Sequence, residues 1–378
     1  MSKQVLVMIN LRGGADGLNI VVPYREENYY QIRPTISLSA PNNTNGVIDL
    51  DGFFGIHPAL APLIPLYKNK QLAFLHAVGW PGDSHSHFEA WEEIELGIAG
   101  QEKPTTGWLT RYLQLIAPEA PESSPLQTIN FSAWPSKLFI GCQGTNQLTQ
   151  LSDFRLAQSN KSNKPNILES LKSLYSQTST LGMVGQQTIN ALEKVNKILE
   201  ANLIGKNYPK TKFGNQLQSV AELINADIGL KATSLDLNGW DTHIMQGAAK
   251  GHMASLLSEL ANSIATFAEH LQDKWKDVLL VVMTEFGRRA MENASAGTEH
   301  GQGGVMFFAG GQVKGGHVYG DWPGLAQDKL VDPGDLAITT DFRQALSEFI
   351  IPQVGVANIT KIFPAYQIRK QLGILASQ

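Results

Sequence analysis

The sequence predicts an α/β fold in which helices cover both faces of a mostly parallel β-sheet. Apolar runs of strand length alternate along the chain with longer segments in which apolar residues recur at helical spacing. The runs are continuous rather than alternating, which is typical of strands buried on both faces of a parallel sheet. With 378 residues, of which 43% are hydrophobic, the chain can bury a large core.

The N-terminal part begins with a predicted strand at residues 4–11, which runs into a glycine-rich turn. After an irregular insertion rich in Pro and Asn at residues 24–56, a helix is expected to begin at Pro58, because proline suits the first helical turn. A second buried strand at residues 72–78 leads through a turn into a helix that ends near Leu96.

The middle of the chain, residues 117–226, reads as a second insertion. Pro, Ser, Asn and Gln dominate its first part, in which a short strand is expected near residues 138–140. Apolar residues at helical spacing predict helices at residues 165–203 and 211–226.

The C-terminal part returns to alternating strands and helices. A strand at residues 232–237 is followed by a long helix with one apolar face at residues 246–274. Further strands are predicted at residues 278–283 and 305–309, and the last long helix begins near Thr340. Since no linker is long or polar enough to mark a boundary, we expect one domain that carries the two insertions.

The composition argues against several classes of protein. A net charge of −4 and a pI near 6.1 disfavour a nucleic-acid-binding protein, which usually shows a basic face. Cys142 is the only cysteine, so neither an internal disulfide nor a thiolate metal cluster can form. No run approaches the ~20 apolar residues that span a bilayer. The chain as written is expected in the cytoplasm, but an exported chain that had lost its leader would look the same.

Asp241 and His243 are the first candidate metal ligands. One residue separates them, so on an extended backbone both side chains point the same way and could bind one ion. Glu285, at the end of the strand at residues 278–283, and His300, in a glycine-rich loop, also follow strand ends, where open α/β sheets bind ligands. These ligands predict a divalent metal, zinc first, with manganese, calcium or iron as alternatives. In the other interpretation, Asp241 caps the turn and His243 bonds locally.

Asp16 is a further candidate ligand, because it lies just past the end of the first strand. Its alternative role is to accept backbone hydrogen bonds in the glycine-rich turn.

Ser86 is the candidate for the attacking group. It follows a strand end and precedes a helix, so its hydroxyl would lie beside the free N–H groups of a helix N-terminus. Plain capping is the alternative, since Ser86 and Glu89 have the spacing of a capping box. Arg12 and Arg288 are expected to neutralise the oxygens of a phosphate or sulfate, with ordinary ion pairs as the alternative.

Several short motifs of this chain, taken together, resemble the bacterial domain-of-unknown-function 1501 family, which is often described as sulfatase-like. The motifs occur in order over nearly the whole sequence: residues 12–19 (RGGADGLN), 57–60 (HPAL), 86–88 (SHF), 239–243 (GWDTH), 284–288 (TEFGR), 299–301 (EHG) and 315–316 (GG).

This family resembles the alkaline phosphatase and sulfatase superfamily. The resemblance implies a three-layer α/β/α sandwich with metal ions at the strand ends. It implies that Asp16 binds a metal, that Asp241, His243 and His300 bind one ion, and that Ser86 takes the place of the attacking group. The chain departs from the superfamily at Glu285-Phe286, where an Asp-His or Asp-Asn pair is usual.

These observations predict a metal-dependent hydrolase that acts on a phosphate or sulfate ester, either a small molecule or a group on a polymer. The ion would activate Ser86 or a water molecule, and Arg12 or Arg288 would stabilise the developing charge. One alternative is a binding or accessory protein that keeps the fold without the chemistry. Another is a phosphomutase-like transferase, in which Ser86 would carry the phosphoryl group. The sequence gives no indication of the oligomeric state.

Overall fold

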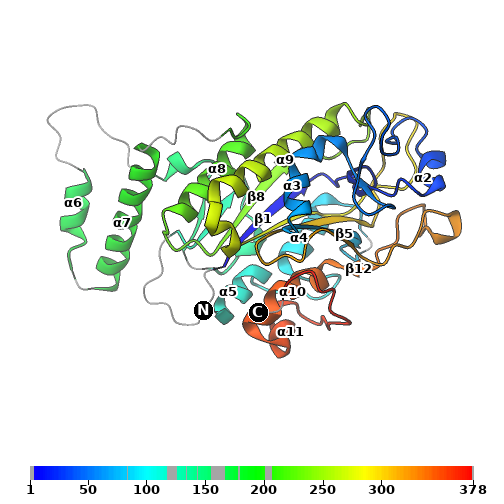
Figure 1. Ribbon diagram of the computed structural model, residues 1–378. Coiled ribbons are helices and arrows are strands. Elements are labelled where there is room, and N and C mark those ends of the chain that lie inside the picture. Colours follow the sequence, from blue (N-terminus) through cyan, green and yellow to red (C-terminus); the bar gives the residue numbers. More distant parts are fainter. Residues whose placement is uncertain are drawn as a thin grey trace.

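The computed structural model describes residues 4–376 except 83, 117–125, 133, 143, 155–166, 178 and 201–206. In this part of the chain, nine strands form one sheet (Figure 1). They are β1 (Val5–Arg12), β5 (Leu72–Gly79), β6 (Thr128–Phe131), β7 (Thr145–Gln147), β8 (Ala232–Asn238), β9 (Val278–Thr284), β10 (Gly304–Gly310), β11 (Val318–Tyr319) and β12 (Thr340–Asp341). A small second sheet holds β2 (Val21–Val22), β4 (Gly55–Ile56) and β3 (Ile48–Asp49).

The central sheet is mostly parallel, as the sequence predicts. Its strand order is β11-β5-β10-β9-β1-β8-β6-β7, with β12 beside β5. Strand β1 is parallel to both of its neighbours, β8 and β9. Only β10 runs against its neighbours, β5 and β9. The carboxyl ends of β1, β5, β8 and β9 therefore meet at one edge, and the loops that follow them lie together.

Helices cover both faces of this sheet. They are α1 (Gly17–Ile20), α2 (Glu27–Ile32), η1 (Pro58–Leu63), α3 (Ile64–Lys68), α4 (His87–Leu96), α5 (Trp108–Ile116), α6 (Ile167–Leu174), α7 (Thr180–Glu200), α8 (Lys212–Asn225), α9 (His252–Leu271), α10 (Phe342–Val354) and α11 (Ile359–Ile362). Figure 1 places α8 and α9 on one face, α5 and α10 on the other, and α6 and α7 at one end of the molecule.

The side chains of β1 show why this strand needs cover on both sides. Val7 and Ile9 belong to the core beneath α8 and α9, whereas Leu6 and Met8 belong to the core beneath α4, α5 and α10. Alternate residues of a strand face opposite sides, so a strand that is apolar at every position must be covered on both faces of the sheet. The sandwich of three layers follows from this pattern.

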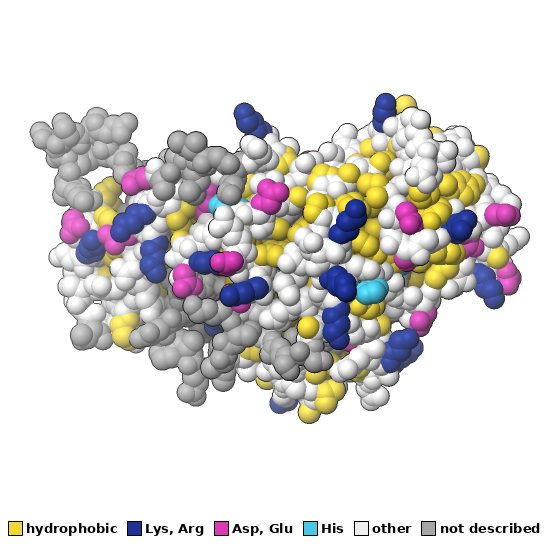
Figure 2. Space-filling model, viewed as in Figure 1, with side chains coloured by type: hydrophobic (Ala, Val, Ile, Leu, Met, Phe, Trp, Pro, Cys, Tyr) yellow, Lys and Arg dark blue, Asp and Glu magenta, His cyan; other side chains and the backbone are white. Residues whose placement is uncertain are grey.

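Apolar side chains remain at the surface on the α9 face. Figure 2 shows them gathered over η1, α3 and α9. They include Ile64, Leu66 and Leu256, which are partly buried and pack on the core below. Apolar atoms make up more than half of the surface of a typical folded protein, so these side chains do not by themselves mark a site.

Some predicted elements differ in the structure. The strand expected near residues 138–140 is wrong, because Lys137–Phe139 form a short 3-10 helix capped by the Ser136 hydroxyl, which accepts from the Leu138 N–H. The helix expected at residues 165–203 is divided into α6 and α7, and residues 201–203 lie outside the described chain. No described helix is long and apolar enough to cross a membrane.

The buried His76 makes the stability of the fold depend on pH. Burial within β5 lowers the pKa of His76 to about 4, although its hydrogen bond to the Val21 carbonyl opposes the shift. The unfolded chain, with a histidine pKa near 6.5, then binds the proton more readily than the folded chain. The contribution of neutral His76 to the free energy of unfolding is therefore fully present above about pH 6.5, and it is lost as the pH drops toward 4.

We expect His76 to lower the free energy of unfolding by about 2 kcal/mol between pH 7.5 and pH 5. Urea denaturation at both pH values, with a chelator present, measures this loss. His76→Gln should lose about 2 kcal/mol less over the same step, and an equal loss in the two proteins would contradict the assignment.

Candidate metal centre

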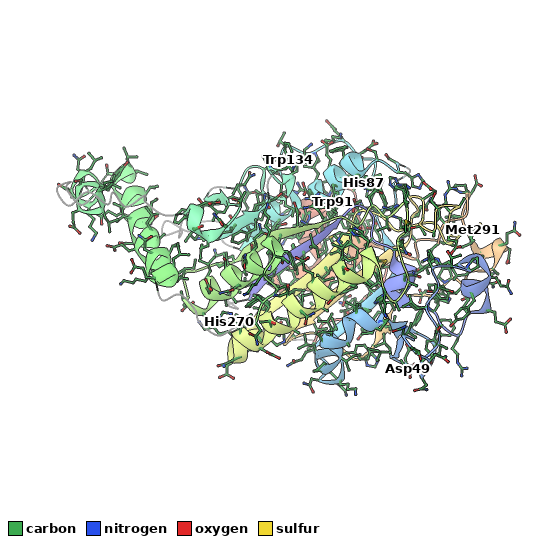
Figure 3. The ribbon with its side chains drawn as sticks, turned by 90° about the horizontal axis from the view of Figure 1, so that it is seen from above. Asp49, His87, Trp91, Trp134, His270 and Met291 are labelled. Carbon is green, nitrogen blue, oxygen red and sulfur yellow. The ribbon has the colours of Figure 1, made fainter. Side chains whose placement is uncertain are left out.

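Four polar side chains converge at the carboxyl edge of the sheet. Asp241 and His243 lie in the loop after β8, and His87 is the first residue of α4, after β5. His300 lies in the loop between β9 and β10. Figure 3 shows His87 among the loops at this edge. Because the parallel strands bring their carboxyl ends together, residues far apart in the sequence meet here.

The distances among these groups are those of one shared centre. Asp241 Oδ1 lies 2.9 Å from His243 Nε2 and 3.0 Å from His300 Nε2. The two Nε2 atoms are themselves 3.0 Å apart. His87 Nε2 lies 3.6 Å from Asp241 Oδ2, and His87, Asp241 and His300 each place one ligand atom within 4.8 Å of the others.

The second nitrogen of each imidazole is committed to an acceptor outside this centre. His243 Nδ1 is 2.8 Å from Glu299 Oε2, and His87 Nδ1 is 2.7 Å from Glu285 Oε1. His300 Nδ1 is 2.9 Å from the carbonyl oxygen of His85. Carboxylate and carbonyl oxygens only accept, so each Nδ1 donates its proton outward. In the neutral imidazoles each Nε2 then presents a lone pair to the centre.

Protons alone do not satisfy this arrangement. Asp241 Oδ1, His243 Nε2 and His300 Nε2 form a triangle with edges of 2.9–3.0 Å. In the neutral tautomers all three edges join lone pairs, and a proton on one Nε2 bridges one edge only. A cation at the centre satisfies all three atoms, and ligands about 2.0–2.2 Å from one zinc ion lie roughly 3.3–3.5 Å apart in a tetrahedron. The donor set therefore fits a metal ion.

His87 provides an independent sign of a missing partner. Its Nε2 atom is buried and has no hydrogen-bond partner among the described residues. A buried polar atom normally has a partner, because its desolvation is otherwise uncompensated. Since this atom faces Asp241, the partner that it lacks would lie at the same centre as the other ligands.

Asp241 is held in its ionised form by its neighbours. Partial burial raises its pKa, but the hydrogen bond from Arg288 and the charge of that guanidinium outweigh burial and lower the pKa to about 2, to which His300 adds a hydrogen bond only when its Nε2 carries a proton. Arg288 Nη2 lies 2.5 Å from Asp241 Oδ1. The rest of the Arg288 guanidinium donates to backbone carbonyls, among them those of Gly14 and Thr298. This buried arginine thus orients Asp241.

Phe286 forms an apolar wall behind two of the imidazoles. Its ring stacks on His87 at 4.9 Å between centroids and packs at 4.9 Å against His300. The hydrogen bond to Glu285 raises the pKa of His87, whereas burial lowers the pKa of His300. Phe286 therefore helps to position the two rings.

Glu285 and Asp16 lie apart from the converging atoms. Glu285 is fully buried, and its Oε1 accepts from the Gly13 N–H and from His87, while its Oε2 accepts from the Thr284 hydroxyl. It stands behind His87, in the position from which carboxylates usually orient a ligand histidine. Glu285 was predicted to bind the metal, whereas its contacts in the structure are with Gly13, His87 and Thr284.

Asp16 makes a buried ion pair away from the cluster. Its Oδ2 lies 2.5 Å from Arg33 Nη1 and accepts from Gln246 Nε2 at 2.7 Å. Its Oδ1 is buried without a partner among the described residues. Asp16 was predicted to bind the metal, whereas its contacts in the structure are with Arg33 and Gln246.

Ser86 is exposed at the N-cap of α4, immediately before His87. Its side chain makes no capping hydrogen bond, so the capping alternative is not realised. Arg12 is engaged elsewhere: its guanidinium pairs with Glu95 at 2.9 Å and with Asp236 at 3.0 Å, and it lies over the ring of Trp91.

His87 was not among the predicted ligands, and neither was Glu299, which contacts His243 as Glu285 contacts His87. His87 belongs to residues 84–87, in which Ser86 was predicted as the attacking group. The available signal was that His87 begins α4, directly after the loop that follows β5, as Asp241 lies in the loop after β8.

Comparisons with known proteins describe the chain's relatives. A family model described as "Protein of unknown function (DUF1501)" matches residues 3–346. Among solved structures, the chain is similar to the crystal structure of the lipoteichoic acid synthase LtaP from Listeria monocytogenes, with 9% identity and a TM-score of 0.30. That similarity covers 90% of this chain and 75% of the synthase chain. No curated protein matches the chain significantly.

Proposed function

Because the chain belongs to the DUF1501 family, whose function is unknown, we propose a function from its own geometry: a metal-dependent hydrolase of a phosphate or sulfate ester. The observation that carries the proposal is the convergence of three imidazole Nε2 atoms on one ionised carboxylate, with every Nδ1 proton directed outward. The likeness of its motifs to the alkaline phosphatase and sulfatase superfamily suggests the ester.

Asp241, His243 and His300 would hold the ion, with His87 as a fourth ligand. A donor set of three imidazoles and one carboxylate suits zinc, and also manganese or iron, better than calcium, which prefers oxygen ligands. A bound divalent ion would polarise the ester and lower the pKa of a bound water molecule.

The protein's own groups prepare this centre. Glu285 and Glu299 keep His87 and His243 in the tautomer whose Nε2 is free, and Arg288 keeps Asp241 ionised and in place. Phe286 excludes water from one side of the imidazoles, which strengthens the electrostatic interactions there. Ser86 offers an exposed hydroxyl next to His87, so the attacking group is either this hydroxyl or a water molecule.

One observation favours the non-catalytic alternative, a binding or accessory protein. Arg12 and Arg288 both donate to protein acceptors, so neither guanidinium is free to bind the oxygens of an ester. Arg12, whose side chain is 22% exposed, could exchange partners when a substrate binds, whereas Arg288 is buried.

Metal analysis of the purified protein, together with turnover of 4-nitrophenyl phosphate and 4-nitrophenyl sulfate, tests the proposal. We expect about one metal ion per chain after metal loading and turnover of at least one ester, which a chelator removes. Protein that holds no metal under metal-replete conditions would reject the proposal. Metal binding without turnover of any ester would support the accessory protein.

Ser86→Ala separates the two attacking groups. If the hydroxyl attacks, turnover should fall about 100-fold or more with metal content unchanged. If turnover is unchanged, water is the attacking group. A phosphorylated Ser86 that can be trapped and transferred to a second hydroxyl would indicate the transferase.

A further inference from the structure

A second candidate site lies at the same edge of the sheet as the metal cluster. A cavity of about 350 Å³ opens between the ends of β6 and β8 and the N-terminal part of α8. Its lining includes Phe131, Trp134, Phe213, Gln216, Asp236 and Glu259. This volume lies at the small end of the range for small-molecule sites, so the cavity suits one small ring rather than a large ligand.

Trp134 is one of the residues that line this cavity. The side chain is 79% exposed, yet the backbone of the residue is fixed. Its N–H donates to Ser132 Oγ at 3.1 Å, and its carbonyl accepts from Asn130 Nδ2 at 3.2 Å. A large exposed aromatic face is a favourable surface for stacking an apolar face of a ligand.

The polar groups of the lining include two carboxylates, which only accept hydrogen bonds when ionised. Asp236 is held in place by the Ser132 hydroxyl, which donates at 2.6 Å, and by Arg12. Glu259 adds a second carboxylate, and Lys212 is the one cationic side chain of the lining. Buried Gln216 is fixed by its hydrogen bond to the Thr149 carbonyl. Such a lining disfavours a further anionic group and suits a ligand that donates several hydrogen bonds.

The cavity and the metal cluster are neighbours along the loop after β8. Asn238 lines the cavity and Asp241 follows it by three residues, which span at most about 11 Å. Arg12 also joins the two sites, since it pairs with Asp236 and lies 4.0 Å from the ring centroid of Trp91, one helical turn after His87. Figure 3 shows Trp91 between Trp134 and His87.

We propose that this cavity is a subsite for a saccharide ring of the ester substrate. A saccharide ring has an apolar C–H face, which would stack on Trp134, and hydroxyl groups around its edge, which would donate to Asp236 and Glu259. The inference rests on the proposed function for the ester that lies at the metal cluster, whereas saccharide binding itself does not depend on turnover. The substrate class would then be a sugar phosphate or sulfate, free or within a glycan.

Kinetics of Trp134→Ala test the subsite in the metal-loaded protein. The ring-bearing esters are glucose 6-phosphate and N-acetylglucosamine 6-sulfate, and the ringless ones are ethyl phosphate and methyl sulfate. KM for the ring-bearing esters should rise about tenfold, the usual cost of truncating a tryptophan contact. KM for the ringless esters and kcat for all four should not change. Trp134→Phe should recover most of the loss, and Val356→Ala, a truncation of another exposed apolar side chain, should have no effect.

A binding experiment separates this inference from the hydrolase. Saturation-transfer NMR with the methyl glycosides of glucose, galactose and N-acetylglucosamine should give signals that Trp134→Ala removes. Such binding without turnover of any ester supports the subsite while the hydrolase fails. Turnover with no glycoside binding and no selective effect of Trp134→Ala overturns the subsite alone. Binding of adenosine or uridine in preference to every glycoside also overturns it, in favour of a nucleobase site.

Discussion

Replacing His300 with alanine is expected to abolish tight metal binding and to lower ester turnover at least about a thousandfold. His300 Nε2 is one corner of the triangle that it forms with Asp241 and His243, and its removal leaves Asp241, His243 and the more distant His87 as ligands. The fold should survive, because outside this centre the side chain contributes a hydrogen bond to the His85 carbonyl and ring contacts. Competition with a chromogenic chelator measures the affinity, and circular dichroism checks the fold.

Two variants set the scale of this loss. Glu299→Gln keeps an acceptor near His243 Nδ1 but weakens it, so metal affinity should fall by about 10–100-fold, less than in His300→Ala. His317→Ala removes an exposed histidine away from the cluster and should leave the affinity unchanged. If His300→Ala binds the metal as tightly as the unaltered protein, the proposed centre is wrong.

Replacing Asp16 with alanine is expected to lower the free energy of unfolding by about 3–5 kcal/mol. Asp16 and Arg33 have fully buried side chains, and the variant would leave the Arg33 guanidinium charged and without its carboxylate. Arg33 would keep its bonds to Asn19 and to the Ala290 carbonyl, which satisfy donors but not charge. Urea denaturation with chelator present measures the loss.

The same variant decides between two roles for Asp16. The superfamily resemblance implies a metal ligand, whereas the contacts indicate a structural ion pair. In the structural role, Asp16→Ala that is still folded at low temperature should bind the metal as tightly as the unaltered protein. Asp16→Ala/Arg33→Met, which removes both charges, should recover part of the stability. A large loss of metal affinity with little loss of stability would instead identify a ligand.

The sequence predicts most of the central sheet because its strands carry a local signal. Residues 5–9 of β1 and 278–283 of β9 are apolar at every position, and they are buried on both faces as expected. The error near residues 138–140 has a local cause as well, since the Ser136 hydroxyl caps a helical turn that the apolar residues alone do not reveal.

The candidate site was predicted in part. Asp241, His243 and His300 follow strand ends and carry ligand groups, so the rule for open α/β sheets selects them, and the structure brings these three together. Whether Glu285 would bind an ion or orient a histidine depends on His87, which is 198 residues away in the sequence. Such pairing depends on register and loop conformation, which no local pattern encodes.

The meeting of three separate loops at the metal cluster also has a consequence for folding. His243 and His300 are 57 residues apart, and His87 joins them from a third strand, so the full set of ligands exists only after β5, β8 and β9 have assembled. An ion bound there would act as a long-range cross-link that the unfolded chain cannot form. At a free concentration of 100 times its Kd, it would stabilise the native chain by about 2.7 kcal/mol. Metal supply would then control how long the protein persists against proteolysis, whether or not a substrate is present.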